Sequence, residues 1–199
     1  MKDLFTVPVC TNNVNRFAGK QVLSHRSTIS EHSFEVTYYS TLIVQKLVMD
    51  GFLTAEQGLE VNQYSLVHDI PEIFTGDVPY TAKARFPELK ETLNKVEQEI
   101  WEEVLPTFRT PASAEAKFIC KVADAIAVSR EIMTEFSMGN IFFGESELEN
   151  CRNIFTTCFN KYRGEVSDDV WMGTLQSLLH MAHGSSIEHL VKEAIGNAD

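Results

Sequence analysis

The side chains best suited to chemistry lie in His68-Asp69-Ile70-Pro71-Glu72 and in Gly76-Asp77 just after it. Adjacent residues of a helix project about 100° apart, so His68 and Asp69 can reach one ion only near the end of a helix. An imidazole and a carboxylate together suit a borderline divalent ion such as zinc, cobalt or manganese. The pair alone is equally compatible with an aspartate that orients an exposed imidazole.

Two further polar residues lie where apolar side chains would be expected. His32 falls on an apolar helix face, where an unpartnered imidazole costs a few kcal/mol in desolvation. Asp124 lies among small and apolar residues, where a buried carboxylate requires a compensating cation. A hydrogen-bonded core histidine and an ion pair from Lys121 to Asp124 are the structural alternatives. Together with His68 and Asp69, these residues predict a four-ligand metal site with positions left for water and substrate.

The helix that carries His32 is expected to begin at residue 28 and to end near residue 50. Thr28 and Glu31 have the spacing of a capping box, and Asp50-Gly51 stops the apolar pattern. Hydrophobic residues recur on two of its sides, one of which contains Phe34, Tyr38 and Leu42. A helix that is apolar on more than one side is typically buried, so this one is expected to be central.

The remainder of the chain also has helical periodicity. Pro71 disfavours the α conformation at Ile70 and predicts a kink or a fresh start after a helix over 54–70. Further helices are expected over 86–104, 111–137, 146–162, 167–183 and 185–195. Patterns typical of strands are weak and limited to Val7-Pro8-Val9 and Val22-Leu23. The sequence therefore predicts an all-α helical bundle, a single domain over 1–199 with its motifs in 16–140 and further helices in 141–199.

Composition and charge narrow the classes of function. The 199 residues include 28 acidic and 17 basic side chains, which give a net charge of −11. Such a charge disfavours nucleic acid and anionic membranes as partners. No apolar run approaches the ~20 residues that span a bilayer, and the first residues do not resemble a secretory signal. The four cysteines contain no CxxC pair, so free thiols and a cytoplasmic location are expected.

The order of His32, His68-Asp69 and Asp124 resembles the signature of the HD-domain phosphohydrolases, an all-α superfamily of metal-dependent enzymes. More closely, Ser30-Glu31-His32-Ser33 and the stretch from His68 to Pro79 are similar to motifs of the bacterial 5′-deoxynucleotidases. Those enzymes act on deoxyribonucleoside 5′-monophosphates, and the match spans about residues 16–140. The resemblance implies one divalent ion per site, such as cobalt, manganese or zinc, held by His32, His68, Asp69 and Asp124.

The same resemblance implies catalytic roles for two acidic residues. Glu72 would take a proton from the attacking water, as a carboxylate beside a metal ion can. Asp77 would lie in the pocket near the sugar or the leaving oxygen. A solvated glutamate near a helix end and an aspartate that caps the turn at Gly76 are the alternatives for these two positions.

Substrate contacts are implied for four more residues. Arg16 matches the phosphate-binding arginine of the family, Lys83 matches a second cation, and Arg26 is a further candidate; each is also compatible with ordinary surface charge. Phe17 would contact the sugar. It stands where the family usually has a tryptophan, which leaves the base and sugar selectivity open.

The expected reaction is metal-dependent hydrolysis of deoxynucleoside 5′-monophosphates to deoxynucleoside and phosphate. The nearest alternative is a deoxynucleoside triphosphate phosphohydrolase, for which more than two or three cations in the pocket would be expected. More remote alternatives are a non-catalytic nucleotide sensor and a cyclic phosphodiesterase. The resemblance also implies a homodimer or larger homo-oligomer, whose interface or core would use Phe142, Phe143, Phe155 and Phe159.

Overall fold

The computed structural model describes residues 6–104, 112–140 and 144–196. Helices dominate these ranges and no β-strand occurs in them, which confirms the all-α prediction. The two weak strand signals are wrong. Val7–Thr11 forms the short helix α1, in which the Thr11 hydroxyl donates to the carbonyl of Val7, and Pro8 is tolerated because it lies in the first turn. Val22 and Leu23 lie in a loop.

Helix α2 (Ile29–Met49) begins and ends where its capping signals predict. The Thr28 hydroxyl accepts the N–H of Glu31, and the Glu31 carboxylate accepts the N–H of Thr28. Only one side of α2 is buried, with His32 and Leu47 on it. The second apolar side, which contains Phe34, Tyr38 and Leu42, is exposed, contrary to prediction, because no helix in the described ranges covers it.

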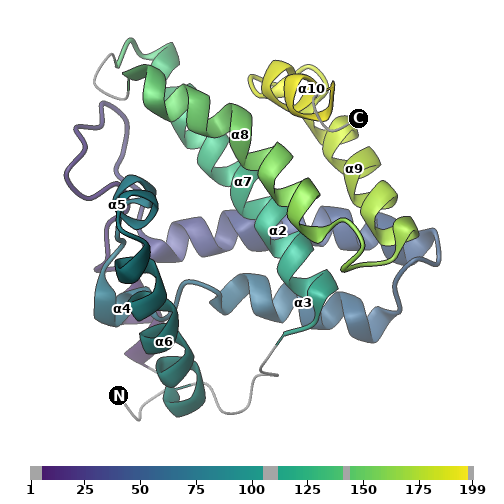
Figure 1. Cartoon of the computed structure of the whole chain (residues 1–199), viewed down its shortest axis with the longest axis horizontal. Helices are drawn as coiled ribbons and strands as arrows, with labels where there is room; N and C mark the ends of the chain where they lie inside the picture. Colours follow the sequence, from purple (N-terminus) through teal and green to yellow (C-terminus); the bar gives the residue numbers. More distant parts are fainter. Residues whose placement is uncertain (1–5, 105–111, 141–143, 197–199) are drawn as a thin grey trace.

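Helix α3 (Ala55–Val67) returns along α2 after a short connection (Figure 1). The two helices approach closely at Gly58, where an added Cβ would lie 2.6 Å from Cγ1 of Val44. The chain then makes a fresh start at Pro71 rather than a kink, since the short helix α4 (Glu72–Thr75) follows a turn. Helix α3 ends at Val67, three residues before the helix end expected at 70. His68 and Asp69 therefore lie between two helices.

Helix α7 (Ala114–Ser137) packs against α2, α3 and α8 (Gly144–Tyr162) and forms the middle of the bundle (Figure 1). It begins at its cap Ser113, whose hydroxyl accepts the N–H of Ala116; the Thr110-Pro111 start signal lies outside the described residues. The remaining helices are α5 (Tyr80–Arg85), α6 (Pro87–Val104), α9 (Asp168–Ala182) and α10 (Glu188–Gly196).

One hydrophobic core extends from α2 and α3 through α7 to α8, α9 and α10. Phe118 packs edge-on against Phe159, with ring centroids 5.3 Å apart, and Phe155 is fully buried. Phe155 and Phe159 of α8 are therefore core residues, whereas Phe142 and Phe143 lie outside the described residues. The four cysteines are free thiols.

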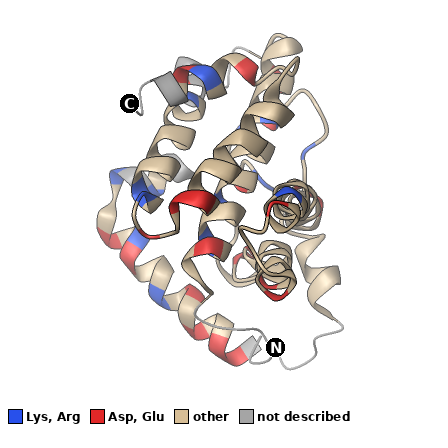
Figure 2. Cartoon of the chain, turned by 90° about the vertical axis from the view of Figure 1, so that its right-hand side faces the viewer, with Lys and Arg blue, Asp and Glu red and all other residues tan. Residues whose placement is uncertain are grey.

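Charged residues lie mainly on the outside of this bundle, and acidic positions occur along many of its helices (Figure 2). Within the described ranges, every helix is too short or too polar to serve as a bilayer crossing.

Candidate active site

Three segments far apart in the sequence bring the predicted metal ligands together. His32 lies in the first turn of α2, His68 follows the last residue of α3, and Asp124 lies in the middle of α7. One potential ligand atom from each of these residues lies within 4.8 Å of the others. Nε2 of His32 lies 3.2 Å from Oδ1 of Asp124.

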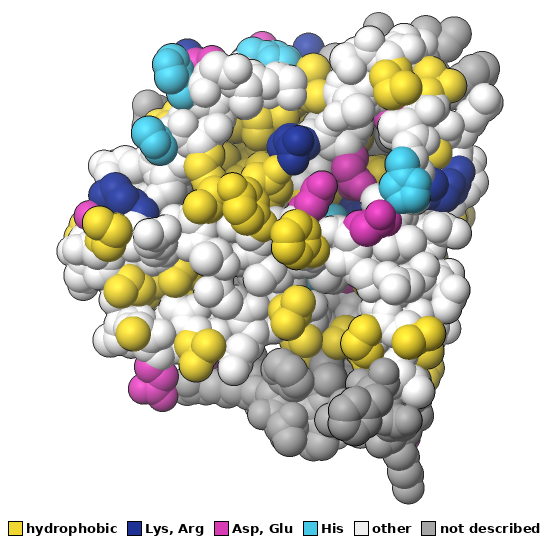
Figure 3. Space-filling model, turned by 180° about the vertical axis from the view of Figure 1, so that it is seen from behind, with side chains coloured by type: hydrophobic (Ala, Val, Ile, Leu, Met, Phe, Trp, Pro, Cys, Tyr) yellow, Lys and Arg dark blue, Asp and Glu magenta, His cyan; other side chains and the backbone are white. Residues whose placement is uncertain are grey.

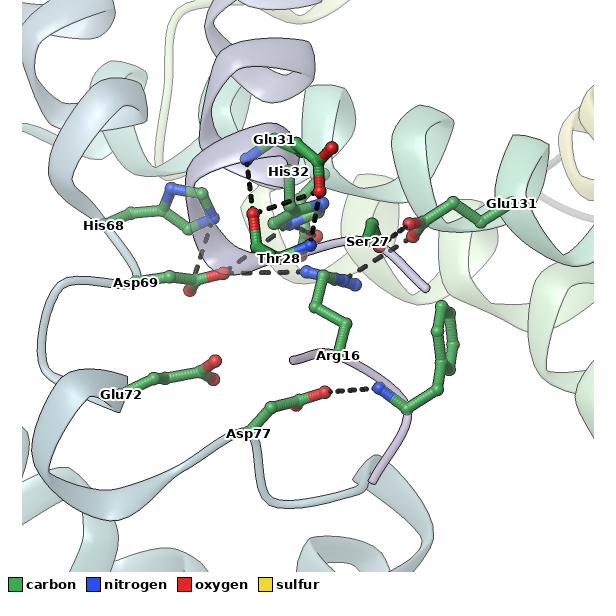
Figure 4. Close-up of polar contacts among 12 residues, drawn as sticks. Arg16, Ser27, Thr28, Glu31, His32, His68, Asp69, Glu72, Asp77 and Glu131 are labelled. Atoms are coloured by element: carbon green, nitrogen blue, oxygen red, sulfur yellow. Dashed lines mark hydrogen bonds and ion pairs between the residues drawn. The ribbon is translucent and has the colours of Figure 1, made fainter. Parts of the chain in front are cut away.

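The fourth predicted ligand, Asp69, contacts both imidazoles from the side of the α3–α4 turn (Figure 4). Its Oδ1 lies 3.3 Å from Nε2 of His68, and its Oδ2 lies 3.5 Å from Nε2 of His32. The second oxygen also lies 3.8 Å from a guanidinium nitrogen of Arg16. Asp69 thus joins the ligand group to the cation next to it.

The two histidines have nitrogens that a metal ion would satisfy. Neither ring nitrogen of His32 has a hydrogen-bond partner in the described part of the chain, and Nε2 of His68 lacks one too. Nδ1 of His68 donates to the carbonyl of Ser65 at 2.8 Å, which leaves the Nε2 lone pair free. Burial lowers the pKa of His68 and keeps it neutral. The residues therefore fit a divalent ion with nitrogen and oxygen ligands.

Asp124 has a cationic partner on its own helix. The Lys121 ammonium donates to Oδ2 of Asp124, so the salt bridge and the proximity to both histidines occur together. Burial opposes ionisation of Asp124, but Lys121 and the two imidazoles outweigh it and hold its pKa well below the ordinary value. The Lys121 side chain is 54% exposed.

Glu72 and Asp77 point into the same space beneath Asp69 and Arg16 (Figure 4). Glu72 is buried, with Oε1 3.8 Å from the ammonium of Lys83 and no hydrogen bond to Oε2 among the described residues. Burial first, and then the charges of Asp69 and Asp77, raise the pKa of Glu72 to about 9. Such a shift is typical of a carboxylate placed to exchange a proton.

Asp77 holds the backbone of the N-terminal segment. Its Oδ2 accepts the N–H of Phe17 at 2.8 Å, which joins the loop after α4 to the turn at residues 16–20. Phe17 adopts a φ of 53°, in the left-handed region that a side chain with a Cβ seldom occupies. Arg26 donates to the carbonyl of Phe17 at 2.9 Å and also to that of Lys20. The Arg26 guanidinium is thus hydrogen-bonded to backbone carbonyl groups and does not lie at the ligand group.

Arg16 is buried between two carboxylates on different elements. Its Nη1 faces Asp69, and its Nε lies 3.5 Å from Oε2 of Glu131 on α7. Glu131 also accepts a hydrogen bond from the Ser27 hydroxyl. The predicted phosphate-binding cation is therefore held beside the predicted metal ligands.

Glu131 and Glu135 are site-supporting residues that the sequence reasoning missed. The Glu135 carboxylate is 2% exposed and accepts the backbone N–H groups of Leu23 and Ser24 and the side-chain amide of Asn140. Glu131 and Glu135 follow Asp124 by seven and eleven residues, a spacing that places all three on one stripe of α7. The recurrence of acidic residues on one side of this helix is the sequence signal that could have identified Glu131 and Glu135.

A pocket of about 340 Å³ opens next to the ligand group. His68, Asp69, Glu72 and Asp124 line one part of it. Lys83 also lines the pocket, as expected for a cation that faces the substrate. The aromatic side chains of Tyr64 and Tyr162 line it as well. The volume falls within the range of small-molecule sites.

Comparison with known proteins agrees with this geometry. The sequence model of the 5′-deoxynucleotidase YfbR-like family matches residues 5–160. A 5′-deoxynucleotidase of Yersinia pseudotuberculosis is 30% identical over 139 residues, covering 61% of this chain and 69% of that protein. A 5′-deoxynucleotidase of Photorhabdus laumondii is 26% identical over 171 residues, covering 71% of this chain and 85% of that protein.

Two solved structures share the fold. An HD phosphohydrolase of cyanophage S-2L, bound to dA and one catalytic Zn²⁺ ion, superposes with a TM-score of 0.70 at 17% identity, covering 93% of this chain and 99% of that one. An HD-domain phosphohydrolase of Listeria innocua gives a TM-score of 0.68 at 21% identity, covering 98% of this chain and 97% of that one. With the HD-domain fold and a family match over most of its length, the chain belongs to the YfbR-like 5′-deoxynucleotidase family.

Proposed function

We propose that this protein is a divalent-metal-dependent hydrolase that converts deoxyribonucleoside 5′-monophosphates to deoxynucleoside and inorganic phosphate. One observation carries the proposal: His32, His68 and Asp124 lie close together beside a pocket that Glu72 lines. The buried Nε2 atoms of both histidines have no hydrogen-bond partner among the described residues. The names of the curated relatives and the dA and Zn²⁺ bound by the cyanophage protein support the same substrate class and cofactor.

In this proposal His32, His68, Asp69 and Asp124 hold one ion of cobalt, manganese or zinc. When bound, such an ion supplies Lewis acidity, which polarises a phosphoryl oxygen and lowers the pKa of water. The hydrogen bond from His68 to the carbonyl of Ser65 keeps the imidazole in the orientation and tautomer that ligation requires.

Glu72 is the proposed general base. Its carboxylate faces the pocket, and a nearby cation would lower its pKa from about 9 towards the pH at which a base works well. Glu72 accepts a proton from water as the water oxygen attacks phosphorus. The bond from phosphorus to the 5′ oxygen breaks, and this oxygen leaves as the hydroxyl of the deoxynucleoside with the proton that Glu72 took from the water.

Arg16 and Lys83 are proposed to offset the charge of the phosphate from two sides. Arg16 is held by Glu131 and Asp69, so its guanidinium loses little freedom on binding. Phe17 is proposed to contact the sugar, and Asp77 fixes the backbone of Phe17 in its strained conformation. We therefore propose that Asp77 positions Phe17 for its contact with the sugar by holding the backbone of this turn.

The test is a product assay with purified protein freed of metal by a chelator. We expect manganese, cobalt or zinc to restore release of phosphate and deoxynucleoside in equal amounts from dAMP and other deoxynucleoside monophosphates. The matched control is Glu72→Gln, which should bind the ion and dAMP but release at least 100-fold less phosphate. Absence of phosphate from every monophosphate, with the ion bound one to one, would refute the proposal and favour a silent sensor.

We also propose that the protein is a cytoplasmic homodimer or larger homo-oligomer. Hydrophobic side chains are exposed on the face seen from behind in Figure 3, and α2 and α3 expose Phe34, Tyr38, Leu59 and Leu66. Such an exposed set is typical of an interface. The free cysteine thiols suit a reducing compartment. Light scattering after size exclusion should give at least twice the monomer mass, and a monomer at all concentrations would contradict this.

A further inference from the structure

The carboxylate of Asp124 is already paired with a cation from this chain. The ammonium of Lys121 donates to Oδ2 of Asp124, while Oδ1 of the same carboxylate lies 3.2 Å from Nε2 of His32. Asp124, His32 and His68 are also the group that could hold the proposed ion. Lys121 and a divalent ion would therefore compete for the same carboxylate.

The burial of Asp124 explains why a lysine pairs with it. The Asp124 side chain is 12% exposed, and its neighbours Ala123 and Ala125 are fully buried in the middle of α7. An ionised carboxylate in such surroundings is costly unless a cation compensates it. Residues three apart on a helix are neighbours, so Lys121 can reach Asp124 from the previous turn. In the metal-free protein, Lys121 thus supplies the positive charge that a bound ion would otherwise supply.

Lys121 also faces the pocket in which the proposed substrate binds. Its side chain lines this pocket, as do those of Lys83, Lys117 and Lys161. Within the described ranges, Asp124 is the only carboxylate that forms an ion pair with Lys121. An ion at Asp124 would leave the ammonium without its anion and would repel it as well. A phosphate bound in the pocket would supply a new anion, and hydrogen bonds from an ammonium to a phosphate are strong.

We propose that Lys121 has two successive partners, Asp124 in the metal-free protein and the phosphate of the substrate in the metal-loaded protein. This inference rests on the proposed function, which places the ion at Asp124 and the phosphate in the pocket. Lys121 therefore competes with the ion before the ion binds, and it binds phosphate afterwards. The ammonium keeps its proton throughout, and no covalent bond changes. The ion is expected to bind before the nucleotide, because it frees a cation that the nucleotide uses.

The variant Lys121→Gln should change two affinities in opposite directions. Loss of the competing ammonium should tighten ion binding about fivefold, the size expected for one charge-assisted contact that is partly exposed. Loss of the phosphate contact should raise KM for dAMP by about the same factor, with kcat little changed, since the contact is present in the ground state and the transition state alike. A merely structural role of Lys121 would weaken both ligands together.

The first experiment titrates manganese into chelator-treated protein in a calorimeter, without nucleotide. Lys117→Gln is the matched control: Lys117 lies on the same helix and lines the same pocket, and it forms no ion pair in the described part of the chain. The control should bind manganese within about twofold of the parent, because it removes the same charge without touching Asp124. Manganese affinity that is unchanged or weaker in Lys121→Gln, or equally tightened in Lys117→Gln, would overturn the competition.

The second experiment measures the nucleotide. Steady-state hydrolysis of dAMP at saturating manganese gives KM and kcat for the parent and Lys121→Gln. Titration of dAMP into manganese-loaded Glu72→Gln, with and without Lys121→Gln, gives its affinity without turnover. Lys95→Gln is the control, because Lys95 is exposed on α6 and pairs with Glu91. A dAMP affinity that Lys121→Gln does not lower would overturn the second partner.

A third measurement needs no change at Lys121 and does not depend on how that variant folds. Acetic anhydride acetylates accessible lysines, and peptide mass spectrometry gives the rate at each of them. In Glu72→Gln protein, Lys121 should react slowly without metal, faster with manganese, and slowly again with manganese and dAMP, whereas Lys95 should react alike in all three states. One rate for Lys121 in all three states would overturn the exchange of partners.

The outcomes for Lys121 and for the proposed function are distinguishable. Hydrolysis of dAMP by the parent, with manganese affinity unaffected by Lys121→Gln, refutes the role of Lys121 and leaves the proposed function intact. Failure of the parent to hydrolyse any deoxynucleoside monophosphate refutes the proposed function. The manganese titration and the acetylation rates then still decide whether Lys121 exchanges Asp124 for another partner.

Discussion

The carboxylate of Glu72 is buried at the start of α4, and its neighbours are mostly acidic. Asp69 and Asp77 lie close enough to act on its charge, and the ammonium of Lys83 is 3.8 Å from Oε1. Burial and like charges raise its pKa to about 9, so the folded protein without a metal ion retains the Glu72 proton at neutral pH. The unfolded chain loses that proton near pH 4.5.

Glu72→Gln should therefore stabilise the metal-free protein while it removes activity. Between pH 4.5 and 9 the folded state binds more protons at this position than the unfolded state, so its stability falls as the pH rises. Glutamine has no proton to lose and escapes this cost, which is on the order of 5 kcal/mol at pH 8. Urea unfolding of chelator-treated proteins at pH 5 and pH 8 measures the difference.

The gain in the free energy of unfolding from Glu72→Gln should be small at pH 5 and larger at pH 8. A variant that is equally stable or less stable than the parent at pH 8 would show that Glu72 is ionised in the folded protein. Asp77 offers a comparison of another kind, since its carboxylate already accepts a backbone N–H and its replacement by asparagine should destabilise the turn at Phe17.

The side chains that carry the chemistry were recognisable from their residue types and their surroundings. His32 and Asp124 were conspicuous because each interrupts an apolar helix face. The fate of Arg26 could not be inferred, since its carbonyl partners belong to a turn whose shape depends on the strained backbone of Phe17. The contacts of Glu131 likewise depend on how the loop before α2 lies against α7.

At the scale of elements, α7 has a stripe of charged residues along one of its sides. Lys117, Lys121, Asp124, Glu131 and Glu135 recur on it at spacings of three, four and seven. The N-terminal end of the stripe faces the pocket, its middle joins the ligand group, and its C-terminal end holds the loop before α2. One helix face thus positions the proposed ligands, the phosphate-binding arginine and the loop that carries it.

Glu135→Gln should weaken the protein at neutral pH and matter less in acid. Burial opposes ionisation, but hydrogen bonds from Leu23, Ser24 and Asn140 lower the pKa of Glu135 from 4.5 to about 2. A depressed pKa gives stability that is complete above pH 4.5 and is lost as the pH falls towards 2. We expect a loss of about 2 kcal/mol at pH 7 in denaturant unfolding. A difference that is as large at pH 3 would contradict the shift.

Gly58→Ala should loosen the α2–α3 pair that presents His32 and His68. Alanine improves helix propensity by about 1 kcal/mol, but its Cβ would lie 2.6 Å from a methyl group of Val44. Val44 is β-branched and stiff in a helix, so overpacking at about 1–3 kcal/mol outweighs the gain. We expect a net loss of about 1 kcal/mol or more in urea unfolding.

The Gly58→Ala helix shift should also weaken ion binding, because α3 ends directly at His68. Gln63→Ala is the matched control, since Gln63 lies on the exposed side of the same helix. An alanine at 58 that raises stability would show that Val44 moves away at little cost.

For the whole molecule, the all-α class and the longer helices followed from capping signals and periodicity, whereas the short helices α1, α4 and α5 did not. The capping boxes at Thr28 and Thr54 set helix starts to within one residue. The exposure of Phe34 and Tyr38 could not be foreseen, because a helix pattern does not reveal how many neighbours will cover it. The lysines of the pocket come from separate helices, so their gathering depends on tertiary packing alone.

The proposed ion joins parts of the fold that local structure does not join. Its ligands belong to α2, to the turn after α3 and to α7, and Nε2 of His32 and Nε2 of His68 have no hydrogen-bond partner in the described residues. An ion that binds only the folded state adds about 2.7 kcal/mol of stability at one hundred times its Kd. For a chain of this size that corresponds to a rise in Tm on the order of 5–10 °C.

Metal removal should therefore lower Tm by several degrees, and the loss should reverse on addition of manganese, cobalt or zinc in proportion to the logarithm of the ion concentration. Asp124→Asn should abolish this dependence, because it removes the charge that completes the ligand group, whereas Lys95→Gln should preserve it. Scanning calorimetry across ion concentrations measures both slopes. A parent protein whose Tm ignores the ion would contradict the proposal that an ion joins these segments, and would leave the buried Nε2 of His68 without a hydrogen-bond partner among the described residues, a cost of about 1–3 kcal/mol.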